Sequence, residues 1–333
     1  MVEAWGQTSA GRDIKRITLK NGGLTCAIIT FGASIQDLRL EGHGTPLVLG
    51  LASVAAYEAH GLYFGAVVGR CANRIAGGRF CLNKSQVQLA LDDASLQHLH
   101  GGPHGFFNQV WDIESAGENS VTLRLESPDG DMGYPGNLVA LCHYHLTADN
   151  RLEVTLQATS DAPTVCNLAS HAYFNLEDGG ASDVNLHRIA IASDRCLEVD
   201  DNTIPTGIVA DVSGTELDLR ELRQISDFSD FDHNFCLSTK REKLRRVAEV
   251  FAPTSGITMD VLTTEPGLQF YGGTHIGPMM GLDGIAYAAG SGFCLEAQIW
   301  PDAINHAHFP SAILKPREML EQKTVYRFTR AAG

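Results

Sequence analysis

Arg-Leu-Glu-Val-Thr-Leu-Gln-Ala, residues 151–158, is the stretch that decides the fold class, because its apolar residues occupy every second position. Leu152, Val154 and Leu156 would lie on one face of a β-strand, and the polar residues between them on the other. This period of two is typical of a sheet that buries one face. The segment therefore predicts a half-buried strand.

Similar segments recur along the whole chain. They are short, rich in Val, Leu, Ile and Thr, and separated by clusters of Gly, Asp, Asn and Pro. The predicted strands are residues 26–30, 121–125, 138–146, 151–158, 189–192, 257–263, 268–271, 293–300 and 324–329. Helical periodicity is limited to residues 54–60 and 215–222, which disfavours parallel βαβ winding. Because no repeat or Pro-rich linker interrupts the pattern, we expect residues 1–333 to form one all-β domain, a large antiparallel β-sandwich.

The composition is that of a soluble globular protein, with 44% hydrophobic and 19% charged residues among 333. No apolar run reaches the roughly 18 residues of a membrane span. Residues 1–11 lack the basic-then-apolar pattern of a secretory signal, so we expect a cytoplasmic protein. The net charge of -14 opposes binding to nucleic acid or to anionic lipid. The eight cysteines include no Cys-x-x-Cys pair and are interpreted as free thiols, mostly buried.

Phe-Cys-Leu-Glu-Ala-Gln-Ile-Trp, residues 293–300, is the predicted strand that says most about chemistry. Alternation places Cys294, Glu296, Gln298 and Trp300 on one face and apolar residues on the other. A buried carboxylate is costly unless it is hydrogen-bonded or lines a polar cavity. Partial desolvation would raise its pKa toward the range of a general base. The residues alone leave a structural alternative open, in which Glu296 forms a buried ion pair with an arginine.

Four further side chains are candidates for binding or proton transfer. Gln269 shares a predicted strand face with Tyr271, and an amide beside a phenol suits sugar hydroxyls. His100 precedes two glycines, which allow a ligand to approach the main chain closely. His171 lies in a polar and aromatic segment, and a reference pKa of about 6.5 lets either histidine exchange a proton near neutrality. Arg74 could clamp two hydroxyls or form a structural ion pair.

The 13 histidines include three His-x-His pairs, each of which could supply two metal ligands from one strand face. The pairs are His98/His100, His143/His145 and His306/His308. No third ligand stands at a metal-typical spacing beside any of them, so no metal site is expected. The sequence also contains no phosphate-binding glycine loop and no nucleophile elbow. Phosphoryl transfer and serine-hydrolase chemistry are therefore disfavoured.

Eight ordered segments resemble the galactose mutarotase (aldose 1-epimerase) family over nearly the whole chain. They are residues 69–77 (GRCANRIAG), 99–105, 127–136, 167–176, 204–207 (IPTG), 231–235 (FDHNF), 266–271 and 291–305 (SGFCLEAQIWPDAIN). The resemblance implies a β-supersandwich whose open groove binds one free hexose such as galactose or glucose. It also implies interconversion of the α and β anomers of that sugar, with no cofactor.

Roles for individual residues follow from the same resemblance. It implies that Glu296 in the FCLE segment is the general base and that His171 in the HAYFN segment is the general acid. His100 of the LHGG segment is expected to bond the sugar and assist the acid. The residues expected to bind hydroxyls or to line the site are Asn73, Arg74, Tyr173, Asp232 and Gln269.

Three positions depart from the family pattern. Ser170 and Ala172 stand where the family more often has Asn and Ser, and Ala297 where it more often has Thr. The first two flank the expected acid, so we expect an effect on sugar preference. Two alternative functions remain. A hexose-6-phosphate 1-epimerase would need basic residues in the groove beyond Arg74, and a noncatalytic carbohydrate-binding protein would have no use for a paired Glu and His. A monomer and a homodimer are both compatible with the sequence.

Overall fold

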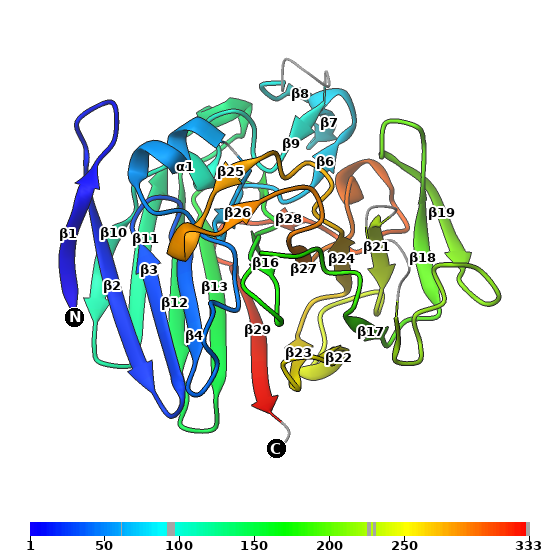
Figure 1. Ribbon diagram of the computed structural model, residues 1–333. Coiled ribbons are helices and arrows are strands. Elements are labelled where there is room, and N and C mark those ends of the chain that lie inside the picture. The colour runs from blue at the N-terminus through cyan, green and yellow to red at the C-terminus, as the bar shows by residue number, and fades with distance from the viewer. Residues whose placement is uncertain (61, 92–96, 225–227, 229–230, 331–333) are drawn as a thin grey trace.

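The computed structural model describes residues 1–333 except 61, 92–96, 225–227, 229–230 and 331–333. Three antiparallel sheets contain most of the strands (Figure 1). The nine-stranded sheet has the order β10 (Asp112–Ala116), β11 (Ser120–Ser127), β12 (Leu138–Leu146), β13 (Arg151–Ser160), β29 (Met319–Arg330), β23 (Ile257–Thr263), β22 (Arg245–Ala252), β17 (Arg188–Ile191) and β20 (Arg223–Gln224). The six-stranded sheet has the order β16 (Tyr173–Phe174), β27 (Phe293–Gln298), β24 (Gly267–Tyr271), β21 (Asp232–Cys236), β18 (Arg195–Val199) and β19 (Pro205–Asp211). The four-stranded sheet consists of β1 (Val2–Gln7), β2 (Asp13–Asn21), β3 (Leu24–Ile29) and β4 (Ser34–Leu40).

Short elements connect the sheets in the described part of the chain. The two-stranded pairs are β5 (Val67–Val68) with β15 (Ala169–Ser170), β6 (Arg74–Ile75) with β9 (His98–Leu99), β7 (Arg79–Leu82) with β8 (Ser85–Gln88), β14 (Thr164–Val165) with β28 (Ile313–Leu314), and β25 (Met279–Met280) with β26 (Ala286–Tyr287). The helical elements are α1 (Val54–His60) and the 3₁₀ turns η1 (Ala76–Gly78), η2 (Phe106–Asn108), η3 (Asp131–Gly133), η5 (Leu282–Gly284) and η6 (Ala303–Asn305). None of the helices described is both long enough and apolar enough to cross a membrane.

The predicted fold class, an all-β antiparallel sandwich, is confirmed by this architecture. The alternation that opened the sequence argument is visible in β13, where Leu152, Val154 and Leu156 are at most 1% exposed and their neighbours face outward. Strands β12 and β23 have the predicted bounds, and the other predicted strands are present with ends that differ by a few residues. Trp300 lies just beyond the end of β27. The helix predicted at residues 54–60 is α1.

The helix predicted at residues 215–222 is wrong, because this segment forms turns and bends. The Thr215 hydroxyl donates to the carbonyl of Val212 and accepts the main-chain N–H of Leu217. The Asp218 carboxylate likewise accepts the main-chain N–H of Arg220 and pairs with its guanidinium. Such local bonds from side chain to main chain compete with helical hydrogen bonds.

The apolar faces of the three sheets meet in one core, and this packing decides which face of β27 is free. Phe293 and Leu295 belong to the same buried cluster as Leu156 of the nine-stranded sheet. The Tyr326 hydroxyl of β29 donates to the main-chain carbonyl of Leu295 at 3.4 Å. Strand β29 therefore lies beneath the apolar face of β27. The residues that alternate with that face, including Glu296, project from the opposite one.

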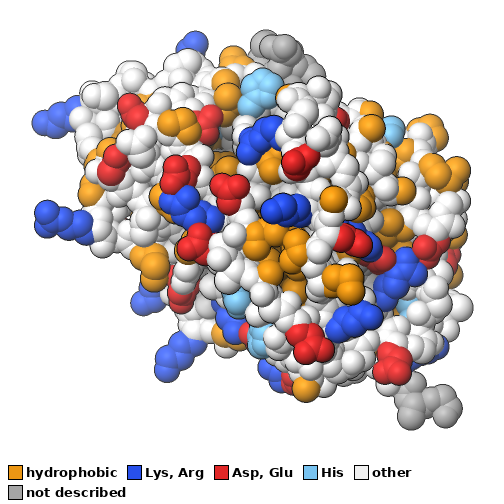
Figure 2. Space-filling view, turned by 90° about the vertical axis from the view of Figure 1, so that its left-hand side faces the viewer, with side chains coloured by type: hydrophobic (Ala, Val, Ile, Leu, Met, Phe, Trp, Pro, Cys, Tyr) orange, Lys and Arg blue, Asp and Glu red, His pale blue; other side chains and the backbone are white. Residues whose placement is uncertain are grey.

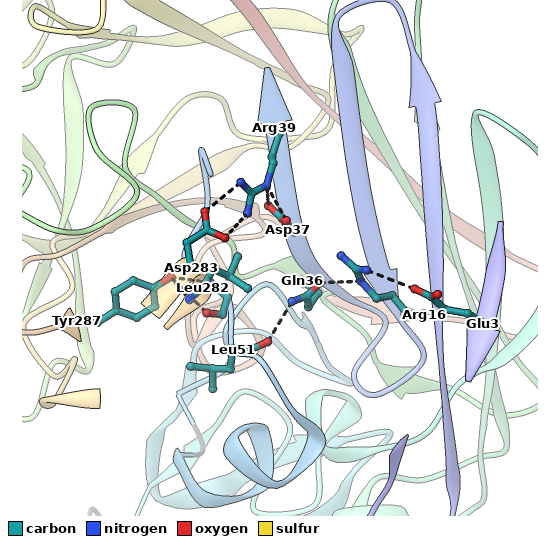
Figure 3. A network of polar contacts seen from close by, with 10 residues as sticks. Glu3, Arg16, Gln36, Asp37, Arg39, Leu51, Leu282, Asp283 and Tyr287 are labelled. Atoms are coloured by element: carbon teal, nitrogen blue, oxygen red, sulfur yellow. Dashed lines mark hydrogen bonds and ion pairs between the residues drawn. The ribbon is translucent and has the colours of Figure 1, made fainter. Parts of the chain in front are cut away.

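A network of polar side chains fastens the N-terminal sheet to the segment that carries β25 and β26 (Figure 3). Arg39 of β4 donates two hydrogen bonds of 3.0 Å to the carboxylate of Asp283 and also contacts Asp37. Gln36 on the same strand donates to the carbonyl of Leu51 at 3.0 Å. A bidentate pair of arginine and carboxylate fixes direction as well as distance. The Arg39–Asp283 pair holds the β1–β4 sheet against the segment around η5, and Gln36 holds the connection that follows β4.

Arg70 is a buried cation that the sequence analysis did not single out. Its side chain is 1% exposed and donates to the hydroxyl and carbonyl of Ser127 and to the carbonyls of Pro128 and Pro135, at 2.8 to 3.1 Å. A hydrogen bond to Thr164 is longer, at 3.5 Å. Arg70 thus supplies the donors for a loop whose carbonyls are turned inward.

We expect Arg70→Met to lower the free energy of unfolding by about 3 kcal/mol, because several largely buried acceptors would lose their donor. Urea denaturation measures this loss. The matched control is Arg79→Met, since Arg79 is exposed and, among the described residues, its Nε bonds only the side chain of Gln88. The control should change stability by less than about 0.5 kcal/mol. Equal unfolding midpoints for the two variants would contradict the role given to Arg70.

Candidate active site

Three neighbouring strands of the six-stranded sheet, β21, β24 and β27, form the floor of the candidate site. Residues directly opposite each other in an antiparallel pair project from the same face. The two aligned rows are Asn234–Gln269–Glu296 and Asp232–Tyr271–Cys294. The floor therefore gathers carboxylates, amides, a phenol and a thiol on the face turned away from the core. The alternation in the sequence predicts this face for both Gln269 and Glu296.

His100 is held beside the floor by its pairing with Asn73. Strands β6 and β9 pair Arg74 with Leu99, and the main-chain N–H of His100 donates to the carbonyl of Asn73 at 3.0 Å. In return, the main-chain N–H of Asn73 donates to Nδ1 of His100 at 3.2 Å. Because a main-chain amide can only donate, Nδ1 is an acceptor. The proton of the neutral His100 imidazole therefore lies on Nε2.

The two glycines after His100 serve the packing of the main chain. The φ angles of Gly101 and Gly102 are 91° and 87°, in the left-handed region that favours glycine. A Cβ atom on Gly101 would lie 1.7 Å from the carbonyl oxygen of Gly69. The sequence analysis expected a close approach at this point. The structure shows that the close neighbour of Gly101 is another part of the same chain.

His171 reaches the floor from the turn between β15 and β16. Its main-chain N–H donates to the carbonyl of Ala66, and its own carbonyl accepts the N–H of Gly65 at 3.0 Å. The Nε2 atom of the ring is 3.7 Å from Oε1 of Glu296. Both side chains are buried, with exposures of 4% and 2%. An imidazole and a carboxylate from distant segments thus face each other at close range.

Burial shifts the pKa values of this carboxylate and this imidazole in opposite directions. It raises the pKa of Glu296 well above the usual range, and the charge of Asp232 raises it further while Arg74 lowers it. Burial also lowers the pKa of His171 to about 4, partly offset by a hydrogen bond to its own main chain and by Asp232. The Oε2 atom of Glu296 is buried with no hydrogen-bond partner among the described residues. Burial therefore favours the uncharged carboxyl and the uncharged imidazole.

A polar wall continues from the floor toward Arg74. The Gln269 amide donates to Oδ1 of Asp232 at 2.6 Å, and the Arg74 guanidinium lies 3.4 Å from Oδ2 of the same carboxylate. Arg74 and Asp232 remain partly exposed, and Asn73, Asp232 and Gln269 line a common cleft. The structural alternative was a buried ion pair between Glu296 and an arginine. Arg74 instead pairs with Asp232, whereas the partner of Glu296 is His171. Hydrogen-bond donors and acceptors alternate along this wall.

Aromatic rings also pack against His171. Tyr173 is 2% exposed, with its ring centroid 5.0 Å from that of His171. Tyr63 lies 4.6 Å from His100 and 5.3 Å from His171, and the sequence analysis missed it. Its backbone has a φ of 59°, which no local sequence pattern predicts. The structure gathers every site residue predicted from the sequence into this one cluster. They are Asn73, Arg74, His100, His171, Tyr173, Asp232, Gln269 and Glu296.

His100, His171 and Glu296 each offer a potential ligand atom, and these atoms lie within 4.8 Å of one another. A metal-bound histidine normally donates its second N–H to a carboxylate or carbonyl. His100 has the opposite polarity, because its Nδ1 accepts the N–H of Asn73 and its Nε2 carries the proton. The donor set therefore does not fit a metal ion. In the pair of His98 and His100, the first ring bonds instead to the Tyr134 hydroxyl and the Ala90 carbonyl.

Known proteins match this chain over most of its length. The family model described as aldose 1-epimerase matches residues 15–327. Galactose mutarotase of Rattus norvegicus is 39% identical over 331 residues, covering 96% of both chains. Aldose 1-epimerase of Escherichia coli K12 is 36% identical over 336 residues, again covering 96% of both. The crystal structure of galactose 1-epimerase from Lactobacillus acidophilus superposes with a TM-score of 0.86 at 28% identity, covering 100% of this chain and 99% of the other.

Proposed function

This chain belongs to the aldose 1-epimerase family, and we propose that Glu296 and His171 carry out its reaction, the interconversion of the α and β anomers of a free aldose such as galactose or glucose. The observation that carries the proposal is the 3.7 Å approach of a buried carboxylate and a buried imidazole on a polar floor. Both groups have lost most of their solvent, and general acid and base catalysis needs them at opposite ends of one hemiacetal.

The reaction begins on the closed sugar, with a carboxylate at Glu296 and an imidazolium at His171. Glu296 takes the proton of the anomeric hydroxyl while Nε2 of His171 gives a proton to the ring oxygen. The bond between the anomeric carbon and the ring oxygen breaks, and the anomeric carbon becomes an aldehyde. The aldehyde then turns about the bond between its first two carbons. As the ring closes on the other face, His171 takes back the proton of the new hydroxyl and Glu296 returns its proton to the aldehyde oxygen.

The electrostatics of the pocket favour ring opening. Once the ring has opened, Glu296 is a neutral carboxylic acid and His171 a neutral imidazole. Burial raises the pKa of the first and lowers the pKa of the second, so both shifts favour the protonation states of the open-chain complex. Desolvation thus makes the carboxylate a stronger base and the imidazolium a stronger acid. The attraction between the charged groups at close range opposes this bias and keeps the closed complex accessible.

The remaining side chains hold the sugar while its reacting end rotates. His100 presents its Nε2–H as a donor, since its Nδ1 is occupied. The polar wall of Asn73, Arg74, Asp232 and Gln269 binds hydroxyls, and Tyr173 supports the His171 ring. Fixing the substrate in this way turns proton transfer into a step within one complex. Protons pass only between these two groups and the sugar, and the two anomers have the same oxidation level, so the reaction needs neither a redox cofactor nor a nucleotide.

We expect freshly dissolved α-galactose and α-glucose to reach anomeric equilibrium faster with this protein, and their 6-phosphates to react with a kcat/KM at least about tenfold lower. The reason is that the guanidinium of Arg74 is already neutralised by Asp232 and the chain as a whole carries a net charge of -14. Polarimetry follows all four sugars. A preference for the phosphorylated sugars would favour the hexose-6-phosphate 1-epimerase. Binding without any acceleration would favour a noncatalytic carbohydrate-binding protein.

We further propose a cytoplasmic enzyme that forms a single domain and acts as a monomer or homodimer. One core cluster that includes residues of all three sheets, from Ile17 to Phe328, supports a single domain. The eight cysteines are free thiols, of which only Cys81 is exposed, and free thiols suit a reducing compartment. Acidic and basic side chains are interspersed on the face shown in Figure 2, which gives nucleic acid no broad basic surface there.

A further inference from the structure

The thiol of Cys294 contacts the nitrogen of His171 that does not face Glu296. The Sγ atom is 3.5 Å from Nδ1 of His171, while Nε2 of the same ring is 3.7 Å from Oε1 of Glu296. Cys294 is fully buried and precedes Glu296 by two residues on the same face of β27. The imidazole thus bridges a thiol and a carboxylate that project from one strand.

The direction of proton transfer requires one tautomer of His171. After Nε2 has given its proton to the sugar, the neutral ring must keep its remaining proton on Nδ1. Only then is Nε2 an acceptor that can take the proton back when the ring closes. In histidine, the hydrogen bond made by one nitrogen decides which proton the other exchanges. The partner of Nδ1 is therefore part of the mechanism.

We propose that Cys294 is a positioning residue whose sulfur accepts a hydrogen bond from Nδ1–H of His171, so that Nε2 is the nitrogen that exchanges its proton with the sugar. This inference rests on the acid role proposed for His171.

A thiol orients the ring without making it a weaker acid. Burial raises the pKa of Cys294 well above the usual range, and the charges of Glu296 and Asp232 raise it further, so the thiol stays uncharged. A carboxylate in its place would stabilise the imidazolium and raise the pKa of His171. The other titratable groups that face the ring are Tyr63, His100, Tyr173 and Glu296. A neutral sulfur thus lets His171 remain a strong acid toward the ring oxygen.

The test reads the tautomer directly, without substrate. Protein with ¹⁵N-labelled histidine is studied by NMR near pH 7.5, above the pKa of about 4 of His171, with the signal assigned by its absence from His171→Asn. We expect the wild type to carry its proton on Nδ1. Cys294→Ala should move the proton distribution toward Nε2, and Cys294→Ser, whose hydroxyl can also accept, should retain the wild-type tautomer.

The kinetic constants of the same variants provide a second test. Cys294→Ala should lower kcat about tenfold with little change in KM, the size typical of a lost partner behind a functional histidine. Cys294→Ser should recover most of the loss. The matched control is Cys142→Ala, which removes another fully buried thiol, from β12, and should change neither tautomer nor kcat. A wild-type proton on Nε2, or a Cys294→Ala protein with the wild-type tautomer, would overturn the proposal. If His171→Asn kept full activity, the acid role would fail whatever the tautomer.

Discussion

Glu296→Gln will reduce the acceleration of galactose mutarotation by about 10³-fold, because an amide of nearly the same shape cannot take the proton of the anomeric hydroxyl. The substitution leaves the floor and its aligned rows in place, so binding of the sugar should change much less than kcat. Polarimetry of freshly dissolved α-galactose, at several protein concentrations, measures the effect. A variant with the wild-type rate would show that another group is the base.

The same substitution should not weaken the fold. Glu296 is buried without a full set of partners, and its pKa is raised in the folded protein. A raised carboxyl pKa means that the folded state disfavours the charged form, so the cost of Glu296 appears as the pH rises above the ordinary carboxyl range. Glu296→Gln should therefore melt at or above the wild-type temperature at pH 8, with a difference that shrinks toward pH 4.

Glu265→Gln is the matched control for this argument. Glu265 is also fully buried, but its carboxylate pairs with Arg241 at 2.7 Å and lies outside the candidate site. Burial raises the pKa of Glu265 as it does that of Glu296, but Glu265→Gln changes no group near His171 and should retain wild-type activity. The two substitutions are chemically identical, so a loss of activity in Glu296→Gln alone separates a catalytic carboxylate from a buried carboxylate elsewhere. A Glu296→Gln protein that melted well below the wild type would contradict the assignment.

Local periodicity explains why the sequence was sufficient for much of the floor. The period of two in residues 293–300 is a property of a single strand, and it places Glu296 opposite the apolar face without any knowledge of neighbours. The same holds for Gln269 on β24. Which strands lie beside each other is not local. The rows that join Asn234 to Gln269 and Glu296 arise from pairings between segments far apart in the chain, and only the structure provides them.

Features without a local signal were missed for the same reason. Tyr63 enters the site through a left-handed backbone conformation and through packing against His100 and Phe107. The first strand, β1, is mostly exposed along its length, so it has no alternating pattern to detect. In residues 215–222, side chains that bond the main chain override a helical pattern of apolar residues. Each of these differences between prediction and structure lies where tertiary contacts, exposure or local polar bonds outweigh periodicity.

His171→Asn will lower kcat/KM by about 10² to 10⁴-fold, because the ring oxygen loses its proton donor while Glu296 remains. Asparagine keeps a polar side chain of moderate size in the pocket. The control is His143→Asn on β12, since His143 bonds only Thr122 among the described residues and should be dispensable for activity. Polarimetric progress curves give the rates of both variants. Equal rates for the two variants would remove His171 from the mechanism.

The pH dependence makes this prediction sharper than a loss of rate. The wild-type pair is active while it holds one proton between its two members, so activity falls when the pair gains a second proton in acid or loses the last one in base. In His171→Asn only Glu296 titrates, and its charged form is the base. The residual rate of that variant should therefore rise with pH through the raised pKa of Glu296 and then stay level, with no decline on the basic side. A bell-shaped profile that survives the loss of the imidazole would mean that its basic limb belongs to a different acid.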